Sequence, residues 1–302
     1  MKKILFIVLF FIGLNAMSQT DTVKYWKFEN QASINFSQSY FSNWAAGGEN
    51  TLATIGNYTF RSDYNKKKHK WTNWLNLALG YSYIGDAKPF KTDDKIEFIS
   101  LYGYELTEKL YLTVMLTFKS QFAKGYNYKV DSTNYVSHFM APATIDISSV
   151  GIEWKPNDHF FVNFSPVTPR WIIVDDQKLA NEGSFGLDPA EKDSAGVIIK
   201  NAKKVKSMFG AKAMLVFKYE VFKNVDFVTK LELFTNYLHN PQNIDVNWQT
   251  AITLKVNSWL NVNITTELIY DDDVIFYDAA GDPIGPRTQF NENMKLGIGV
   301  KF

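Results

Sequence analysis

The sequence predicts an all-β fold, a single closed antiparallel transmembrane β-barrel of about 12 strands. Two observations carry this prediction. Segments of roughly 10 to 15 residues alternate apolar and polar side chains, and beyond the N-terminal apolar run no helical period lasts three turns. The connections between these segments also alternate in length, which is typical of barrels with short periplasmic turns and long extracellular loops.

The chain begins with a predicted cleaved signal peptide at residues 1–18. Lys2 and Lys3 precede an apolar run from Ile4 to Leu14, and the small residues Ala16 and Ser18 follow it. The run is shorter than the about 20 residues that a membrane-spanning helix needs. We therefore expect residues 19–302, a mature chain of 302 − 18 = 284 residues, to form one barrel domain.

Composition narrows the classes of partner. The chain contains no cysteine, so neither a disulfide nor a lipid-anchored cysteine follows the signal. The net charge of +1 gives no reason to expect a nucleic-acid partner. No motif indicates a cofactor, and the expected surroundings are the lipids of an outer membrane.

The twelve expected strands follow one another along the chain with boundaries uncertain by about 2–4 residues. Strand 143–155 breaks the alternation, because Ile145 and Ile147 share one phase whereas Ile152 and Trp154 share the other. We expect a β-bulge or a misplaced boundary there. The strands are expected near residues 25–41, 50–61, 73–84, 95–107, 109–122, 143–155, 159–168, 206–220, 224–238, 245–257, 259–271 and 289–302.

The last segment, 289–302, is among the most regular. Met294, Leu296, Ile298 and Val300 lie on one face, and the chain ends on the aromatic Phe302. This ending resembles the terminal strand by which bacterial outer-membrane barrels are recognised for insertion. An even strand count places both termini in the periplasm, and tryptophans such as Trp71, Trp74, Trp154 and Trp259 are expected as an aromatic girdle near the turn rim. A soluble secreted β-sandwich or a periplasmic barrel remains the alternative.

The polar phase of the strands is expected to line the lumen. A mixed-charge lumen can neutralise itself through pairs on neighbouring strands. Two interpretations stay open: these residues fill and rigidify the interior, or some line a narrow path for a small polar solute. The segment 168–205 either folds inward as a plug or stays a surface loop. The expected lumen-lining residues are Glu105, Lys119, Lys212, Lys218, Glu220, Lys230, Glu232, Lys255, Glu267 and Lys295.

Residues 35–50 read NFSQSYFSNWAAGGEN. This stretch resembles the N-terminal signature of a family of Bacteroidetes outer-membrane β-barrel proteins known only as a domain of unknown function, DUF3078. The resemblance implies an outer-membrane barrel of a Gram-negative bacterium and brings no activity with it. Gly47 and Gly48 permit a hairpin tip and Trp44 can anchor at the membrane interface, while ligand or partner binding is the alternative role. The signature loop comprises Trp44, Gly47, Gly48, Glu49 and Asn50.

No enzyme active site is predicted, and no residue is expected to be catalytic. No Ser-His-Asp set or nucleophile elbow is found. The acidic run 271–273, with His239 two strands away, loosely resembles the Asp/His sites of omptin-like barrel proteases. No metal site is predicted, and the acidic loop is interpreted as a hydrated turn. The alternative is a calcium site, because Asp271, Asp273, Asp278 and Asp282 offer the oxygen ligands that this ion prefers.

The sequence therefore predicts a small-solute channel or gated uptake pore. The alternative is a non-conducting structural or accessory barrel that binds a protein partner in an envelope complex. The basic run Lys66–Lys70 is the candidate contact for that partner, or simply a solvated turn.

Overall fold

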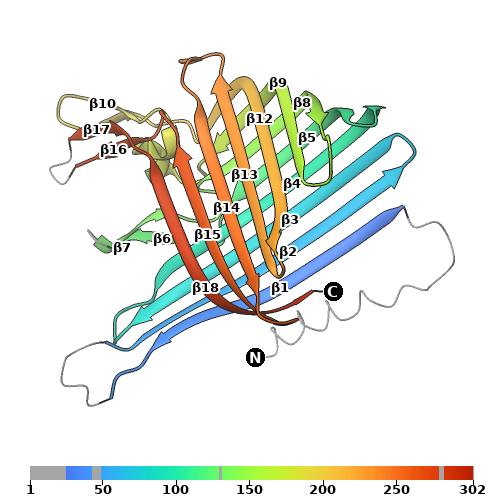
Figure 1. Cartoon of the computed structure of the whole chain (residues 1–302). Coiled ribbons are helices and arrows are strands. Elements are labelled where there is room, and N and C mark those ends of the chain that lie inside the picture. Colours follow the sequence, from blue (N-terminus) through green and yellow to red (C-terminus); the bar gives the residue numbers. More distant parts are fainter. Residues whose placement is uncertain (1–24, 43–48, 129–130, 279–281, 302) are drawn as a thin grey trace, which may run out of the picture.

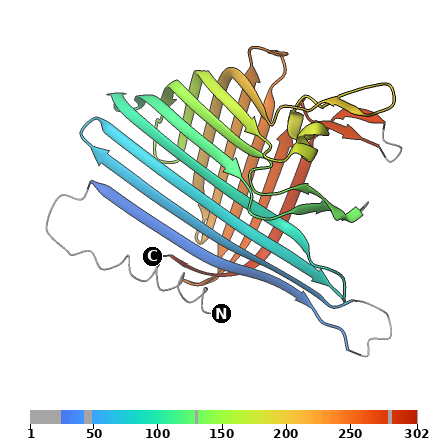
Figure 2. The same cartoon turned by 180° about the vertical axis from the view of Figure 1, so that it is seen from behind.

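The computed structural model describes residues 25–42, 49–128, 131–278 and 282–301. Twelve long strands form a closed antiparallel barrel in the order β1-β18-β15-β14-β13-β12-β9-β8-β5-β4-β3-β2 (Figure 1 and Figure 2). This confirms the predicted fold class. The barrel strands are β1 (Trp26–Ser39), β2 (Thr51–Lys66), β3 (His69–Ile84), β4 (Phe90–Thr107), β5 (Leu110–Ser120), β8 (Ala143–Trp154), β9 (Phe160–Ile173), β12 (Val205–Phe222), β13 (Val225–Asn236), β14 (Asp245–Lys255), β15 (Leu260–Tyr270) and β18 (Gln289–Lys301).

Short elements occupy three of the connections at one rim, which we call the loop rim; the opposite rim carries the turns and is called the turn rim. Among the described residues, no helix has the length and apolar character needed to cross a bilayer. The loop-rim elements are the pair β6 (Gly125–Asn127) and β7 (Asp131–Ser137), the helices α2 (Gln177–Asn181) and η2 (Ser184–Gly186), the pair β10 (Glu191–Lys192) and β11 (Ile198–Lys200), and the pair β16 (Ile275–Tyr277) and β17 (Pro283–Pro286).

Each expected strand is present, but four extend further than expected. β2 and β3 continue through the basic run and meet in a tight turn in which Lys67 has a φ of 53°. β9 continues to Ile173. β4 begins at Phe90 rather than near residue 95, so only residues 85–89 connect β3 to β4, and this connection departs from the expected alternation of short turns and long loops. The start of β4 was hidden because it carries a polar residue on the outer face: Asp94 accepts hydrogen bonds from Lys91 and from the backbone N–H of Phe122.

Burial in the barrel wall is inverted relative to a soluble β-sandwich. Large apolar side chains are exposed on the outer face, among them Ile34, Ile152, Trp154 and Phe164. Charged and polar side chains on the opposite phase are buried, with Lys212 only 1% exposed. Since buried charges are rare in soluble cores, this pattern favours a barrel whose outside faces lipid and whose inside is polar.

The expected irregularity in the sixth strand is a β-bulge. The register between β8 and β9 shifts between Asp146 and Val150 and again before Ile152, and the register with β5 shifts at the same place. As a result Ile147 and Ile152, which lie on opposite phases of the sequence, are both exposed on the outer face. The prediction of a bulge in this strand is confirmed.

The closing seam between β1 and β18 is the shortest ladder of the barrel. Register pairs run only from Gln31↔Lys301 to Phe36↔Leu296, whereas β1 pairs with β2 along its whole length. The two strands then diverge toward the loop rim (Figure 1 and Figure 2). Within the seam, a Cβ atom on Gly297 would lie 2.0 Å from the side-chain oxygen of Asn35, so glycine permits the close approach of this side chain.

The long connection 174–204 packs onto the loop rim. Leu179 and Ala180 of α2 are fully buried against Val174, Met208 and Phe234. Asp176 caps α2 by accepting a hydrogen bond from the Leu179 N–H at 3.0 Å, and it also accepts bonds from Tyr135 and His138. Although burial opposes ionisation, these hydrogen bonds hold the pKa of Asp176 at about 2. The connection is thus tied both to the barrel wall and to β7.

Several predicted features lie outside the described residues. They are the signal peptide 1–18, the loop residues Trp44, Gly47 and Gly48, and the terminal Phe302.

Candidate functional site

The barrel encloses a cavity of about 650 Å³. Its lining comes from every barrel strand except β5, and from the turn between β8 and β9. A space bounded by strands from all round the barrel lies in the lumen. The cavity is therefore the candidate functional site.

A balanced set of charges, which we call the ion-pair network, fills one sector of the lumen. Lys230 Nζ lies 2.6 Å from a Glu97 carboxylate oxygen, and both Lys230 and Lys119 contact Glu232. Lys212 Nζ lies 2.8 Å from Asp146 and 3.2 Å from Glu232. The four cations and four carboxylates sum to 4 − 4 = 0. The members are Lys119, Arg170, Lys212, Lys230, Glu97, Asp146, Glu232 and Asp245.

The inward row of β4 makes a second kind of contact, which we call the cross-lumen pairs. Asp93 pairs with Lys295 of β18 at 2.9 Å, Lys95 lies 4.0 Å from Glu267 of β15, and Glu97 pairs with Lys230 of β13. None of these three strands neighbours β4 in the barrel. The pairs therefore reach across the lumen and obstruct it.

The structure places the expected lumen-lining residues in three groups. Lys218, Lys230, Glu267 and Lys295 line the cavity. Lys119, Lys212 and Glu232 belong to the ion-pair network. The remaining three, Glu105, Glu220 and Lys255, lie near the turn rim and are not part of the cavity lining.

Sequence reasoning missed several charged residues that the structure brings to the lumen. Asp146 lies on the bulged strand β8, where the phase of the alternation changes. Asp93 and Arg170 lie beyond the expected ends of β4 and β9. Extending each strand by its phase would have found Asp93, which is two residues from Lys95 on the same face.

Apolar side chains also line part of the lumen. Ile99, Leu101 and Met214 are buried together, and Trp74 and Phe161 pack against them while facing the cavity. Trp74 therefore does not belong to the expected aromatic girdle. Its ring centroid lies 5.6 Å from the guanidinium carbon of Arg61.

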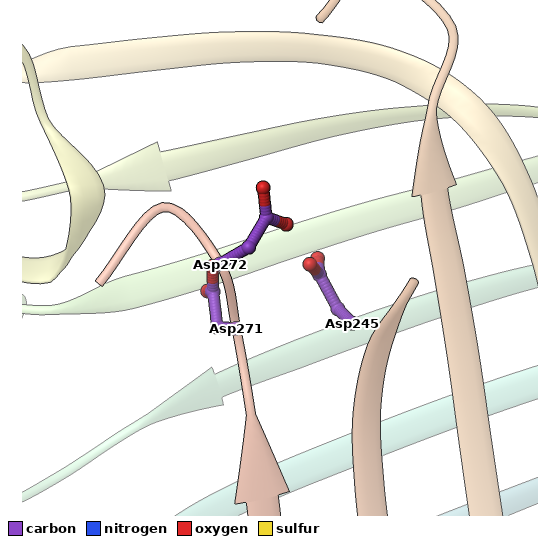
Figure 3. Close-up of side chains that lie close together, drawn as sticks. All are labelled: Asp245, Asp271 and Asp272. Atoms are coloured by element: carbon purple, nitrogen blue, oxygen red, sulfur yellow. The ribbon is translucent and has the colours of Figure 1, made fainter. Parts of the chain in front are cut away.

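Three aspartates come together near the loop rim (Figure 3). Asp245, Asp271 and Asp272 each offer one oxygen within 4.8 Å of the others. Burial raises the pKa of Asp271, and the neighbouring carboxylates of Asp273 and Asp272 raise it further. Arg170 pairs with Asp245 at 2.9 Å, so a protein cation already balances part of the negative charge.

This cluster differs from the calcium set expected as an alternative. Asp282 donates its backbone N–H to Asp278 within its own loop. The side chain of Asp273 pairs with Lys206 at 2.6 Å. His239 contacts Asn240, and no ion pair joins it to residues 271–273 in the described part of the chain. The arrangement considered for a protease-like site is therefore not assembled.

Two residues of the signature loop are described. The side-chain oxygen of Asn50 accepts a hydrogen bond from the Phe41 N–H at 2.7 Å, and the Asn50 carbonyl accepts one from Gly85. The carboxylate of Glu49 lies against Gly85, whose φ is 51°. These contacts connect the first loop to the β3–β4 connection.

The family described as "Protein of unknown function (DUF3078)" has a model that matches residues 36–126 of the chain. The match begins within the signature stretch and runs from the end of β1 into β6. It confirms the resemblance to the DUF3078 family. None of the curated proteins matches the chain.

The chain is similar in fold to solved outer-membrane barrels at very low sequence identity. The NanC porin has 7% identity and a TM-score of 0.36, with 91% of this chain and 100% of that chain covered. The translocator domain of the autotransporter NalP from Neisseria meningitidis has 8% identity and a TM-score of 0.33, covering 96% and 91%. OprB from Pseudomonas putida has 8% identity and a TM-score of 0.34, covering 92% and 94%.

Proposed function

We propose that the protein is an outer-membrane β-barrel that passes small solutes through a gated lumen. The observation that carries this proposal is the cavity of about 650 Å³, which is walled by almost every strand and bounded by charged pairs that reach across the barrel. An apolar outer face and a polar interior suit a barrel that spans a membrane. The proposed location is the outer membrane of a Gram-negative bacterium.

The turn rim is proposed to face the periplasm. β1 begins and β18 ends near this rim, close to the turns after β2 and β14. Short turns on the periplasmic side and long connections outside are the usual arrangement. Both termini would then be periplasmic, as expected for a chain that reaches the membrane from that side.

Two of the cross-lumen pairs, Lys95 with Glu267 and Lys295 with Asp93, are the proposed gate. The side chains of Lys95 and Glu267 are 30% and 29% exposed and lie 4.0 Å apart, so water or a solute can replace their contact at low cost. By contrast, Lys212 and Asp146 are 1% and 3% exposed. We therefore place the solute path beside β15 and β18, with the ion-pair network as the rigid opposite wall.

Single-channel conductance of the purified, detergent-folded protein in a planar bilayer tests this proposal. Discrete current steps are expected, and Lys295→Glu should shift the preference between cations and anions because Lys295 faces the path. Lys223→Glu, in the exposed β12–β13 turn, is the matched control and should leave that preference unchanged. Silence from correctly folded and inserted protein would overturn the proposed passage.

A second candidate function is a non-conducting barrel that binds an acidic partner at the turn rim. The observation that favours it is the ordered basic turn: Lys66 lies 4.6 Å from the ring centroid of Tyr25, and Lys68 lies 6.0 Å from that of Tyr104. Cation–π contacts hold these side chains in place at the rim. Replacing Lys66, Lys67 and Lys68 by glutamine should abolish co-purification of an envelope partner, and unchanged co-purification would exclude this role.

A further inference from the structure

The turn-rim end of the cavity carries more positive than negative charge. Arg61, Lys70, Lys155 and Lys218 line it. Three of these cations have partners: Arg61 pairs with Asp63 at 2.7 Å, Lys70 with Glu153 at 2.6 Å and Lys155 with Asp158 at 2.8 Å. The balance of four cations against three carboxylates is 4 − 3 = +1.

Lys218 carries this excess charge. It lies in β12 next to the β8–β9 turn, where its backbone N–H bonds to the His159 carbonyl at 2.8 Å. Arg61 and Lys155 lie within electrostatic range of its ammonium group, as do the carboxylates of Asp63 and Asp158, which already pair with those two cations. Within the described ranges, no carboxylate lies at ion-pair distance from Lys218. Lys218 is exposed to solvent at the edge of the cavity, so its ammonium group is accessible to one negative charge from solution.

An apolar surface adjoins this ammonium group. Met214, Val216 and Lys218 occupy successive inward positions of β12, so the charged group continues an apolar row. Val216 is opposite Phe161 in the β9–β12 register, and both pack against the buried cluster around Ile99. Apolar surface facing a water-filled lumen is unfavourable by about 25 cal/mol per Å² unless something covers it.

The ring of Trp74 closes this apolar surface on the side of Arg61. A ligand in contact with Trp74, Phe161 and Val216 would place a polar end group between Arg61 and Lys218. The cavity volume lies within the roughly 300–1,000 Å³ that small-molecule sites occupy. Such sites usually combine an apolar lining with a few polar groups that fix orientation.

We propose that this end of the lumen is a binding site for a small amphipathic monoanion, a carboxylate with an aromatic or branched aliphatic body. Its carboxylate pairs with Lys218 beside Arg61, and its body covers Trp74, Phe161 and Val216. This binding site rests on the proposed function, because it would select the solutes that pass through the lumen. It names the class of solute that the gate would admit.

The test is a calorimetric titration of the full detergent-folded protein at pH 7 with 3-phenylpropionate. Its neutral amide and acetate are the paired probes. The carboxylate should bind, and the amide and acetate should each bind at least about tenfold more weakly, because one lacks the charge and the other the apolar body. Lys218→Gln should weaken phenylpropionate binding by about tenfold or more.

Lys223→Gln is the matched control, because Lys223 is exposed in the turn that follows β12 and does not line the cavity. It should bind phenylpropionate as the unchanged protein does, which also corrects for partition of the probe into detergent. Three outcomes would each overturn the site: the acid and the amide bind equally, Lys218→Gln binds as well as the unchanged protein, or no binding is detected up to about 10 mM. The last outcome would mean that the affinity is weaker than millimolar.

Conductance separates this inference from the proposed function. Binding without current would overturn passage while supporting the site. Current without binding would overturn the site while supporting passage. In a barrel that does both, phenylpropionate should block the current of the unchanged protein and of Lys223→Gln, and block Lys218→Gln at least about tenfold less well.

Discussion

Removing the charge of Glu97 should destabilise the barrel, because this carboxylate joins the ion-pair network to the cross-lumen pairs. Glu97 is 1% exposed. Its carboxylate lies 2.6 Å from Lys230, 3.7 Å from Lys119 and accepts a hydrogen bond from Asn76 at 3.2 Å. Glu97→Gln preserves the shape of the side chain but leaves four cations against three carboxylates, a balance of 4 − 3 = +1.

The magnitude follows from these distances. At 2.6 Å and an effective dielectric constant of about 20, the attraction between Lys230 and Glu97 is about 6 kcal/mol. Lys230 retains Glu232 at 3.0 Å, so the net loss is smaller. We expect Glu97→Gln to lower the free energy of unfolding by about 3–5 kcal/mol, the usual effect of removing one partner of a buried pair. The double variant Glu97→Gln/Lys230→Gln restores a balance of 3 − 3 = 0. Its loss of unfolding free energy should be smaller than the sum of the losses of the two single variants by at least about 1 kcal/mol.

Urea unfolding of the protein refolded into lipid vesicles, followed by tryptophan fluorescence, measures both quantities. Glu105→Gln is the matched control, since Glu105 lies on the same inward row of β4 but near the turn rim and outside the network. It should change the free energy of unfolding by less than about 0.5 kcal/mol. The reasoning is refuted if Glu97→Gln is no more destabilising than Glu105→Gln, or if the double variant loses as much as the two single variants together.

Three further predictions concern the wall, the loop rim and the seam. A Cβ atom on Gly210 would lie 1.7 Å from a backbone carbonyl oxygen of β13, so Gly210→Ala should lower the free energy of unfolding by at least about 2 kcal/mol in the same assay, whereas Gly56→Ala, with nothing within 4 Å, should not. The pKa of Asp176 is lowered to about 2, so its hydrogen bond to α2 is fully present above the unfolded value of about 3.9 and is lost as the pH falls toward 2; the protection of the α2 amides against hydrogen exchange, relative to the intrinsic rate at each pH, should fall over this range, and unchanged protection would contradict the cap. Ile34→Cys/Ile298→Cys joins opposite positions of the seam and should form a disulfide on mild oxidation, visible on a non-reducing gel, and its absence would contradict the register.

The sequence was sufficient for the fold because a barrel wall has only two environments. Outward residues face an apolar medium and inward residues a polar one, so alternation persists along each strand. Prediction from the sequence failed where a polar side chain occupies the otherwise apolar outer face. Asp94 places a carboxylate on the outer face near the loop rim, held by Lys91, and there the start of β4 could not be recognised.

The candidate site was less predictable, because its contacts join strands that are distant in both sequence and barrel order. Lys230 and Lys295 were expected in the lumen from their phase, and phase alone cannot say that their partners lie on β4. The apolar surface in the lumen was missed for a similar reason. Trp74 shares the inward phase of Asn76, but a tryptophan near a strand end is more commonly an interfacial anchor.

The solvent exposure of an ion pair in the lumen indicates whether the pair stabilises the barrel or controls passage of solutes. Lys212 and Asp146 are both almost completely buried, so opening their contact would leave charges without solvent, and such pairs behave as fixed parts of the wall. Lys295 and Asp93 are 11% and 23% exposed and already border the cavity, so water can take over their contact when a solute arrives. Variants of the first kind should therefore change the free energy of unfolding with little effect on ion preference, and variants of the second kind should do the reverse. A single residue whose replacement changed both equally would mean that the wall and the gate are one unit.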